Sequence, residues 1–117
     1  MRFLVMVKAT PESEAGVMPT REALAEMGVF NQELAKDGVI LDAGGLEPTS
    51  RSKRISFVGG KPAVIDGPFT ETKELVAGFW MLQAKSKEEI VERLSRAPFD
   101  DAQIEIRRLY EPEDFAQ

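Results

Sequence analysis

Two short segments of this chain are apolar on both faces, and this pattern constrains the fold most strongly. The segments RFLVMVK, residues 2–8, and VAGFWMLQA, residues 76–84, carry apolar side chains at both odd and even positions. Successive side chains of a strand point to opposite faces of a sheet, so strands of this kind are buried on both faces. The sequence therefore predicts a sheet with two central strands whose two faces both need a cover.

Two helices are predicted between the strands. The first begins after Thr20, a suitable N-cap, and runs to about residue 37, where Gly38 stops it. Its apolar side chains recur at the helical period of about 100° per residue and form a core-facing stripe: Ala23, Met27, Phe30 and Leu34. The second helix begins at Ser86, which forms a capping box with Glu89, and it ends before Pro98.

Residues 54–65 predict a β-hairpin. Gly59-Gly60 accepts the positive φ angles of a two-residue turn, and Pro62 marks the second strand of the hairpin as an edge strand. The turn Asp66-Gly67-Pro68 then closes the hairpin and returns the chain to the next strand.

The remaining segments complete the order of elements. Residues 39–41 begin a strand that Gly44-Gly45 ends or bends, and residues 104–107 alternate apolar and polar side chains as a last strand. Residues 10–19 are expected to form a polar loop, and residues 111–117 an acidic tail.

This order is a βαββαβ pattern with a β-hairpin insert. It predicts a ferredoxin-like α+β fold in one domain, residues 1–117. Two helices can cover only one face of such a sheet, whereas the two central strands are apolar on both. A second copy of the chain is the simplest cover for the other face, so we expect a homodimer with the two sheets back to back.

Composition and charge exclude several partners. The net charge of −5 argues against a nucleic-acid partner, which favours a basic surface. No apolar run approaches the roughly 20 residues that span a bilayer, so we expect no membrane partner. The N-terminal residues become polar too soon for a signal peptide, and the chain has no cysteine. We therefore expect a cytoplasmic protein.

The chain contains no histidine, and this limits its chemistry further. Without His or Cys, the Ser-His and Cys-His nucleophile systems and the imidazole and thiolate metal sites are excluded. General acid–base catalysis near neutral pH would need a carboxylate, a lysine, Tyr110 or the N-terminal amine. The carboxylates show no close spacing typical of a metal loop, and the Gly-Gly pairs lack the context of a phosphate loop. We expect neither a metal nor a cofactor.

The string DGPFTETKE, residues 66–74, lies within a longer stretch, residues 44–80, that resembles the YCII-related superfamily in its DGPF branch. The resemblance extends over nearly the whole chain. It implies a ferredoxin-like fold that forms a dimeric α/β barrel. It also implies two kinds of role. Some relatives resemble enzymes that act on aromatic rings with a His and an Asp, and DGPF genes resemble accessory partners of alternative sigma factors.

The chain departs from this family pattern in the first helix. Many relatives carry a histidine in a context resembling A-H-x-x-F, whereas this chain has AEMGVF, residues 25–30, with Met27 at the matching position. Chemistry that depends on the His–Asp pair is therefore not carried over. Asp66 and the string Glu71-Thr72-Lys73-Glu74 do match the motif.

These residues lead to a predicted small-molecule pocket between helix, sheet and hairpin. Its candidate lining residues are Met27, Asn31, Asp66, Phe69, Glu71, Lys73, Glu74 and Trp80. All of them except Asn31 have a structural alternative. The Asp66 carboxylate can accept N–H bonds within its turn, Phe69 and Met27 can be core side chains, and the charge run can be solvated. Trp80 can serve packing alone, although its N–H then needs a partner.

Two functions remain open at this point. The first is a homodimeric domain that binds a small molecule or a protein partner, such as a sigma factor, without catalysing a reaction. The second is a small-molecule lyase or isomerase in which Asp66 is the general base and Lys73 stabilises developing negative charge. An enclosed cavity with Asp66 pointing into it would favour the enzyme.

Overall fold

A computed structural model describes residues 1–71 and 74–116 of the chain. It is a mixed α+β structure with these elements: β1 (Arg2–Lys8), α1 (Pro11–Glu14), α2 (Arg21–Lys36), β2 (Ile40–Gly45), η1 (Thr49–Arg51), β3 (Lys53–Val58), β4 (Lys61–Asp66), β5 (Val76–Gln83), α3 (Lys87–Leu94), β6 (Ile104–Arg108) and η3 (Pro112–Phe115). Across the described ranges, no helix has the length and apolar character that crossing a membrane requires.

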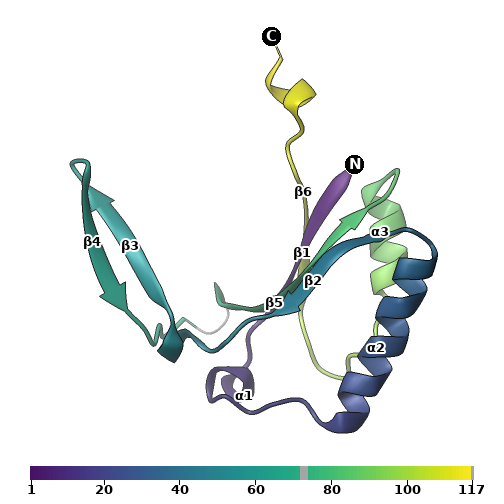
Figure 1. Ribbon diagram of the computed structural model, residues 1–117, viewed down its shortest axis with the longest axis horizontal. Coiled ribbons are helices and arrows are strands. Elements are labelled where there is room, and N and C mark those ends of the chain that lie inside the picture. The colour runs from purple at the N-terminus through teal and green to yellow at the C-terminus, as the bar shows by residue number, and fades with distance from the viewer. Residues whose placement is uncertain (72–73, 117) are drawn as a thin grey trace.

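The main sheet has four strands in the order β2-β5-β1-β6, and every neighbouring pair is antiparallel. The two segments predicted to be central, β1 and β5, occupy the centre of this sheet (Figure 1). With α2 between β1 and β2, and α3 between β5 and β6, the arrangement is consistent with the ferredoxin-like fold.

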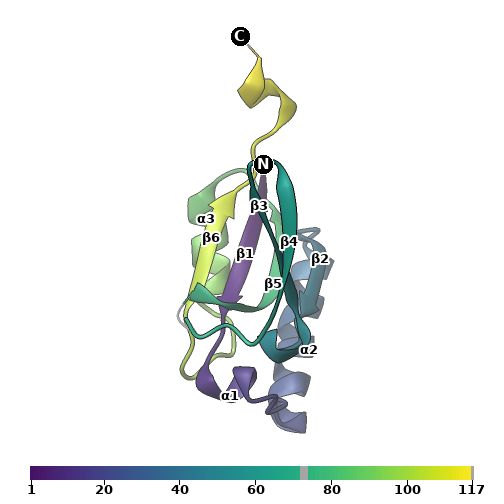
Figure 2. The ribbon, with the colours of Figure 1, turned by 90° about the vertical axis from the view of Figure 1, so that its left-hand side faces the viewer.

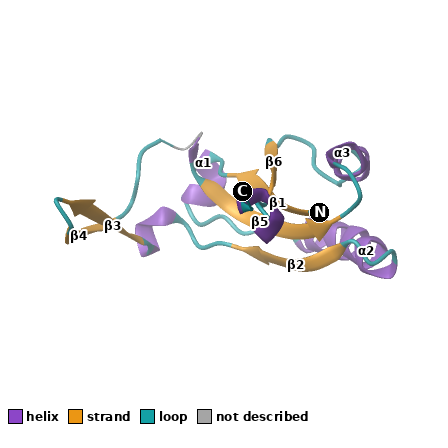
Figure 3. Cartoon of the chain, turned by 90° about the horizontal axis from the view of Figure 1, so that it is seen from above, coloured by secondary structure: helices purple, strands orange, loops and turns teal. Residues whose placement is uncertain are grey.

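One face of the sheet forms the core with the two long helices, which both lie on that side (Figure 3). Strands β1 and β5, helices α2 and α3, and the residue before β2 contribute buried apolar side chains to one cluster: Phe3, Val5, Phe30, Leu34, Val39, Trp80, Leu82, Ile90 and Leu94. The central contact is across the β1–β5 pair, where Val5 lies opposite Trp80. Both helices therefore share one core with the two central strands.

The helix ends follow the sequence signals. The Thr20 hydroxyl accepts a hydrogen bond from the Ala23 N–H at 3.1 Å, and the Ser86 hydroxyl accepts one from the Glu89 N–H at 3.2 Å. Gly38 has a φ of +71°, a left-handed conformation that favours glycine and ends α2. One expected loop differs, because Thr10 caps the short helix α1 within residues 10–19.

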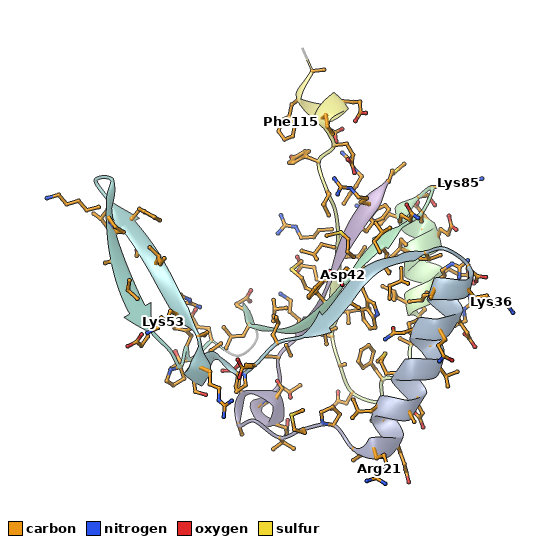
Figure 4. The ribbon with its side chains drawn as sticks, viewed as in Figure 1. Arg21, Lys36, Asp42, Lys53, Lys85 and Phe115 are labelled. Carbon is orange, nitrogen blue, oxygen red and sulfur yellow. The ribbon has the colours of Figure 1, made fainter. Side chains whose placement is uncertain are left out.

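The predicted apolar stripe of α2 is buried over only part of its length. Phe30 and Leu34 are buried, Met27 is half-buried, and Ala23 is exposed. Arg21 and Lys36 mark the two ends of this helix, and its N-terminal turns run past the sheet (Figure 4). The stripe at Ala23 was therefore wrongly assigned to the core, because the periodicity shows a face of the helix but not where the sheet ends.

The second face of the main sheet carries apolar side chains that alternate with those of the core. Leu4 and Met6 of β1 lie opposite Met81 and Phe79 of β5, and all four are half-buried. We call these four residues the open face, because helices α2 and α3 pack on the other side of the sheet. The predicted two-sided apolar character of the central strands is present in the structure.

Residues 53–66, here called the arm, form a separate two-stranded sheet of β3 and β4. Gly59 and Gly60 make its turn, with φ angles of +58° and +79°. The arm extends away from the main sheet, which lies between the arm and the helices α2 and α3 (Figure 1, Figure 2). Every residue of both arm strands is exposed.

The C-terminal tail is fastened to the sheet by ion pairs. Arg2 donates two hydrogen bonds to the Glu111 carboxylate, at 2.9 and 3.1 Å, and Arg108 donates one to Asp114 at 2.9 Å. The hydrogen bond from Arg2 lowers the pKa of Glu111, and the hydrogen bond from Arg108 lowers the pKa of Asp114. The acidic tail thus ends in the short helix η3, with Phe115 exposed at its end (Figure 4).

The chain is extended for its length. Its radius of gyration is 16.4 Å, whereas a compact domain of this length has about 13 Å. Its accessible surface is 8734 Å², whereas a folded monomer of this size exposes about 6300 Å². The arm and the tail, which both project from the main sheet, account for this shape (Figure 1).

The arm should be removable without unfolding the main sheet. The Gly67 N–H donates to the Ser52 carbonyl at 2.9 Å, so these residues already lie side by side. We expect a variant with Asn-Gly in place of residues 53–66 to unfold in one cooperative transition with the near-UV signal of Trp80 preserved.

The control for this deletion is Leu34→Ala in the core, which should cost about 2–5 kcal/mol in the free energy of unfolding. Circular dichroism during thermal and denaturant unfolding measures both variants. Loss of the cooperative transition in the deletion variant would show that the arm is part of the core fold.

Candidate functional site

A cavity of about 350 Å³ opens between α2 and the end of the main sheet. Its walls come from four elements and the segment after α3, and they are lined by Val7, Leu24, Met27, Asn31, Ala43, Gly44, Gly45, Ala77, Gly78, Phe79, Trp80 and Phe99. The cavity lies where the N-terminal half of α2 extends beyond the packed core. Three of the predicted pocket residues, Met27, Asn31 and Trp80, therefore meet in one site.

Trp80 is a lining residue of this cavity that also belongs to the core. It is buried, and its ring packs edge-to-face with Phe30 and Phe99 at centroid distances of 6.2 and 6.1 Å. Its indole N–H donates a hydrogen bond of 2.8 Å to Oδ1 of Asn31. The partner that the sequence required for this N–H is therefore the neighbouring pocket residue.

This hydrogen bond also orients Asn31. An indole N–H can only donate, so it selects the amide oxygen as its partner and turns the Nδ2 group of Asn31 the other way. Apart from the indole N–H of Trp80, this amide is the polar group of the cavity wall among the residues that the structure describes, and the other lining residues are aliphatic, aromatic, methionine or glycine. It offers hydrogen-bond donors to a ligand that carries an oxygen acceptor.

Glycines shape the wall on the side of the sheet. A Cβ on Gly78 would lie 3.1 Å from the carbonyl oxygen of Gly44, and a Cβ on Gly44 would lie 3.2 Å from the Phe79 ring. Gly44 and Gly45 belong to β2 and pair with Phe79 and Gly78, and the strand ends at Gly45. Glycine within a strand often marks a close approach of backbone, as it does here.

Asp66 lies elsewhere, at the base of the arm. Its carboxylate pairs with the ammonium of Lys53 on the opposite strand, at 2.7 Å between Nζ and Oδ1, and both side chains are exposed. Lys53 marks this place in Figure 4. An exposed pair of this kind contributes little stability, about 0–1 kcal/mol. The carboxylate does not line the cavity.

The rest of the DGPF turn connects the arm to the remainder of the chain, here called the body. The residues of this connection, Glu14, Thr49, Gly67 and Phe69, are here called the joint. The Phe69 N–H donates to the Thr49 hydroxyl at 3.0 Å, and that hydroxyl donates in turn to the Glu14 carboxylate. A Cβ on Gly67 would lie 1.7 Å from the Thr49 carbonyl oxygen, so only glycine fits at this position. The guanidinium of Arg54 lies 3.6 Å from the centre of the Phe69 ring.

The predicted pocket residues therefore separate into two groups. Phe69 is half-buried in the joint between arm and body, and Glu71 and Glu74 are exposed and absent from the cavity wall. Lys73 lies outside the described residues. The described part of the DGPFTETKE string supports the arm rather than the cavity.

Sequence reasoning missed several residues of the cavity wall. Gly44, Gly45 and Gly78 gave a usable signal, because glycines inside strands suggest a close approach of another group. Phe99 gave none, since it follows the second helix in a segment without periodicity. Leu24 lies on α2 next to Ala23 of the predicted stripe, and the helical period alone does not assign it to a cavity.

A second cleft, of about 270 Å³, lies between α2 and α3 and is lined mainly by charged side chains. Arg93 donates to Asp37 at 2.8 Å, and this hydrogen bond lowers the pKa of the Asp37 carboxyl. Arg96 pairs with Glu92 at 3.2 Å. Within the described residues, no three His, Cys, Asp or Glu side chains group closely enough to hold a metal ion.

Comparison with known proteins identifies the family. The family model of the YCII-related domain matches residues 1–113, so the chain belongs to the YCII-related family. An uncharacterized protein of Rhizobium meliloti (strain 1021) is 28% identical over 94 residues, which cover 76% of each chain.

The fold also matches a solved structure. It resembles 5-chloro-2-hydroxyhydroquinone dehydrochlorinase from Burkholderia phenoliruptrix AC1100, solved in complex with 2,5-dihydroxybenzoquinone, with a TM-score of 0.55. The two chains are 18% identical, and the match covers 97% of each. At this identity, the likeness shows a common fold.

The position of Met27 gives a test of the cavity. Its side chain is half-buried and lines the cavity while it packs against the core. A histidine of similar length can reach the cavity there, so Met27→His should cost less than about 1.5 kcal/mol in the free energy of unfolding.

The matched control for Met27→His is Leu34→His. Leu34 lies in the same apolar stripe of α2, but its side chain is fully buried in the core. Burying an unpaired imidazole there should cost about 2 kcal/mol or more. Denaturant unfolding compares the two. An equal loss in both variants would show that residue 27 belongs to the core and not to a cavity wall.

Proposed function

We propose that this protein binds a small planar molecule in the cavity beside Trp80 and that it does so as a homodimer, without catalysing a reaction. One observation carries the proposal. Among the described residues, the cavity wall contains no titratable side chain. General acid–base catalysis needs such a group at the reacting atoms, whereas binding needs shape, apolar area and a few oriented polar groups.

The lining favours a flat ring with an oxygen substituent. Aromatic rings at Trp80, Phe79 and Phe99 offer edges and faces for a ring, and the glycine positions of β2 and β5 leave room against the backbone. Nδ2 of Asn31 would donate to the oxygen. The ligand of the dehydrochlorinase complex, 2,5-dihydroxybenzoquinone, belongs to this chemical class and supports the choice.

The alternative function, a small-molecule enzyme, is supported by the similarity of the fold to that of a dehydrochlorinase. In that alternative Asp66 is the general base of a lyase or isomerase, and Lys73 stabilises negative charge. The ion pair of Asp66 with Lys53 at the exposed base of the arm argues against it. Asp66→Asn should therefore leave ligand binding unchanged.

Binding can be followed through the single tryptophan. The probes are 2,5-dihydroxybenzoquinone, catechol and benzoate, titrated by calorimetry and by Trp80 fluorescence. Asn31→Asp keeps an oxygen acceptor for the indole N–H but removes the amide donor, so the affinity should fall at least about tenfold, equal to about 1.4 kcal/mol.

The matched control is Gln32→Glu, which makes the same change of charge at the next residue of α2, exposed and outside the cavity wall. It should retain wild-type affinity. If no probe binds, or if both variants lose affinity equally, the cavity is not the binding site.

The homodimer rests on two features of the surface. The open face presents four apolar side chains at the centre of the sheet. The chain also exposes 8734 Å², about 2400 Å² more than a compact monomer of this size, whereas a stable interface needs about 800 Å² from each partner. Packing the open faces of two copies together would give the barrel that the family resemblance implies.

A charge on the open face should separate the two copies. We expect Met6→Glu to raise the dimer dissociation constant at least about 100-fold, because the carboxylate would be desolvated in the interface. Sedimentation across micromolar concentrations measures it. Val29→Glu, an exposed apolar position on α2, is the control and should not change the association.

The motif of residues 66–74 supports the narrower assignment to the DGPF branch, and the joint that it forms gives that assignment a structural reason. An acidic body of this kind also suits a protein partner. The alternative sigma factor and the cytoplasmic location suggested by the sequence both stay predictions.

A further inference from the structure

We propose that the arm, residues 53–66, is an interaction surface for a second copy of this chain. The inference rests on the homodimer proposed above and adds to it a second contact, separate from the open face. The arm is long, exposed and fixed in direction, and its two faces differ in chemistry. Each of these properties can be read from the described residues.

The strand register divides the arm into an apolar and a polar face. Ile55 lies opposite Val64, and Phe57 lies opposite Pro62, so these four side chains share one face. Ile55, Phe57 and Val64 are 59%, 69% and 63% exposed. This apolar face ends at the base of the arm in the ion pair of Lys53 and Asp66.

The other face of the arm is more polar and is partly covered. Its six side chains are three polar ones, Arg54, Ser56 and Lys61, and three apolar ones, Val58, Ala63 and Ile65. Arg54 contacts the Phe69 ring of the joint, which covers the base of this face. The apolar face holds four neighbouring apolar side chains, and Ile55, Phe57 and Val64 among them are strongly exposed, so it is the face that we propose to dock.

An isolated two-stranded hairpin is only marginally stable in water, and a second layer is needed to hold its shape. The joint supplies a fixed direction: the Thr49 hydroxyl connects Phe69 to Glu14, and Gly67 lies directly against the Thr49 carbonyl. The joint fixes only the base of the arm. The outer half, with Phe57 and Pro62, still requires a cover from outside the chain.

Charge favours a second copy as that cover. Three basic residues and one acid, Lys53, Arg54, Lys61 and Asp66, give the arm a net charge of +2. Since the whole chain carries −5, the remainder carries −7. Lys53 and Asp66 neutralise each other on the apolar face, so the surplus charge belongs to Arg54 and Lys61 on the opposite face. The charge therefore steers the whole arm of one copy toward the acidic body of another, and the apolar face supplies the contact itself.

Geometry and area fit the same partner. The main sheet lies between the arm and the helices, so the arm stands on the side of the sheet away from its own helical layer (Figure 1). Two strands of six residues present a face of about 10 by 20 Å, or about 200 Å² in projection. In a symmetric dimer, the apolar faces of both arms would be covered, so this area would be buried twice.

The test separates the arm from the open face by substituting each face of the arm in turn. Ile55→Ser with Phe57→Ser on the apolar face should raise the dimer dissociation constant at least about 100-fold, because four buried side chains are lost per dimer. Val58→Ser, on the opposite face and 76% exposed, should change it less than about threefold. Sedimentation measures association, and the near-UV signal of Trp80 confirms that each variant is folded.

A photo-crosslinking phenylalanine analogue in place of Phe57 gives an independent readout. Mixing isotopically labelled and unlabelled protein should yield labelled–unlabelled crosslinks of twice the chain mass, and the same analogue at position 58 should yield far fewer. This experiment does not depend on the loss of stability in any variant.

The outcomes distinguish the two proposals. A wild-type chain that stays monomeric would overturn both the homodimer and the arm contact. A wild-type dimer that keeps its dissociation constant in the Ile55/Phe57 variant, without crosslinks from position 57, would overturn the arm contact alone. Binding of monomeric wild-type protein to anionic vesicles that this variant loses would identify a membrane surface as the occupant and also overturn the proposal.

Discussion

The pairing of β1 with β5 is the contact on which the rest of the structure depends. It places Val5 opposite Trp80 on the helical side and Met6 opposite Phe79 on the other side. The helical side orders α2 and α3 through burial of apolar area, the main driving force of folding. The hydrogen bond from Trp80 to Asn31 then fixes one wall of the cavity. The core and the candidate site thus share the same tryptophan.

The DGPF motif has a different role from the one its polar residues suggest. Gly67 permits the approach to the Thr49 carbonyl, and the Phe69 N–H extends the link through Thr49 to Glu14. These contacts set the direction of the arm. Asp66 pairs with Lys53 in solvent, where ion pairs have little energetic value. The described residues of this motif therefore fix the direction of the arm and do not bring a reactive side chain into the cavity.

The shape of the chain links its proposed binding and assembly. A domain with 8734 Å² of accessible surface and a projecting arm leaves apolar area unburied in the monomer. The open face and the apolar face of the arm are separate surfaces, and each is built from strands with a specified register. Phe79 belongs both to the open face and to the cavity wall beside Trp80, so assembly through the open face and ligand binding would share this side chain.

The sequence by itself determined the elements and most of their ends, because caps, glycine stops and strand alternation are local properties: Thr20, Gly38 and Gly59-Gly60 act where the pattern placed them. It also determined that β1 and β5 are central. Only the tertiary structure decided where α2 leaves the core, so that Ala23 is exposed and Met27 lines a cavity, and that Asp66 lies apart from Trp80. These facts depend on distances between segments far apart in the chain, and periodicity along one segment contains no information about them.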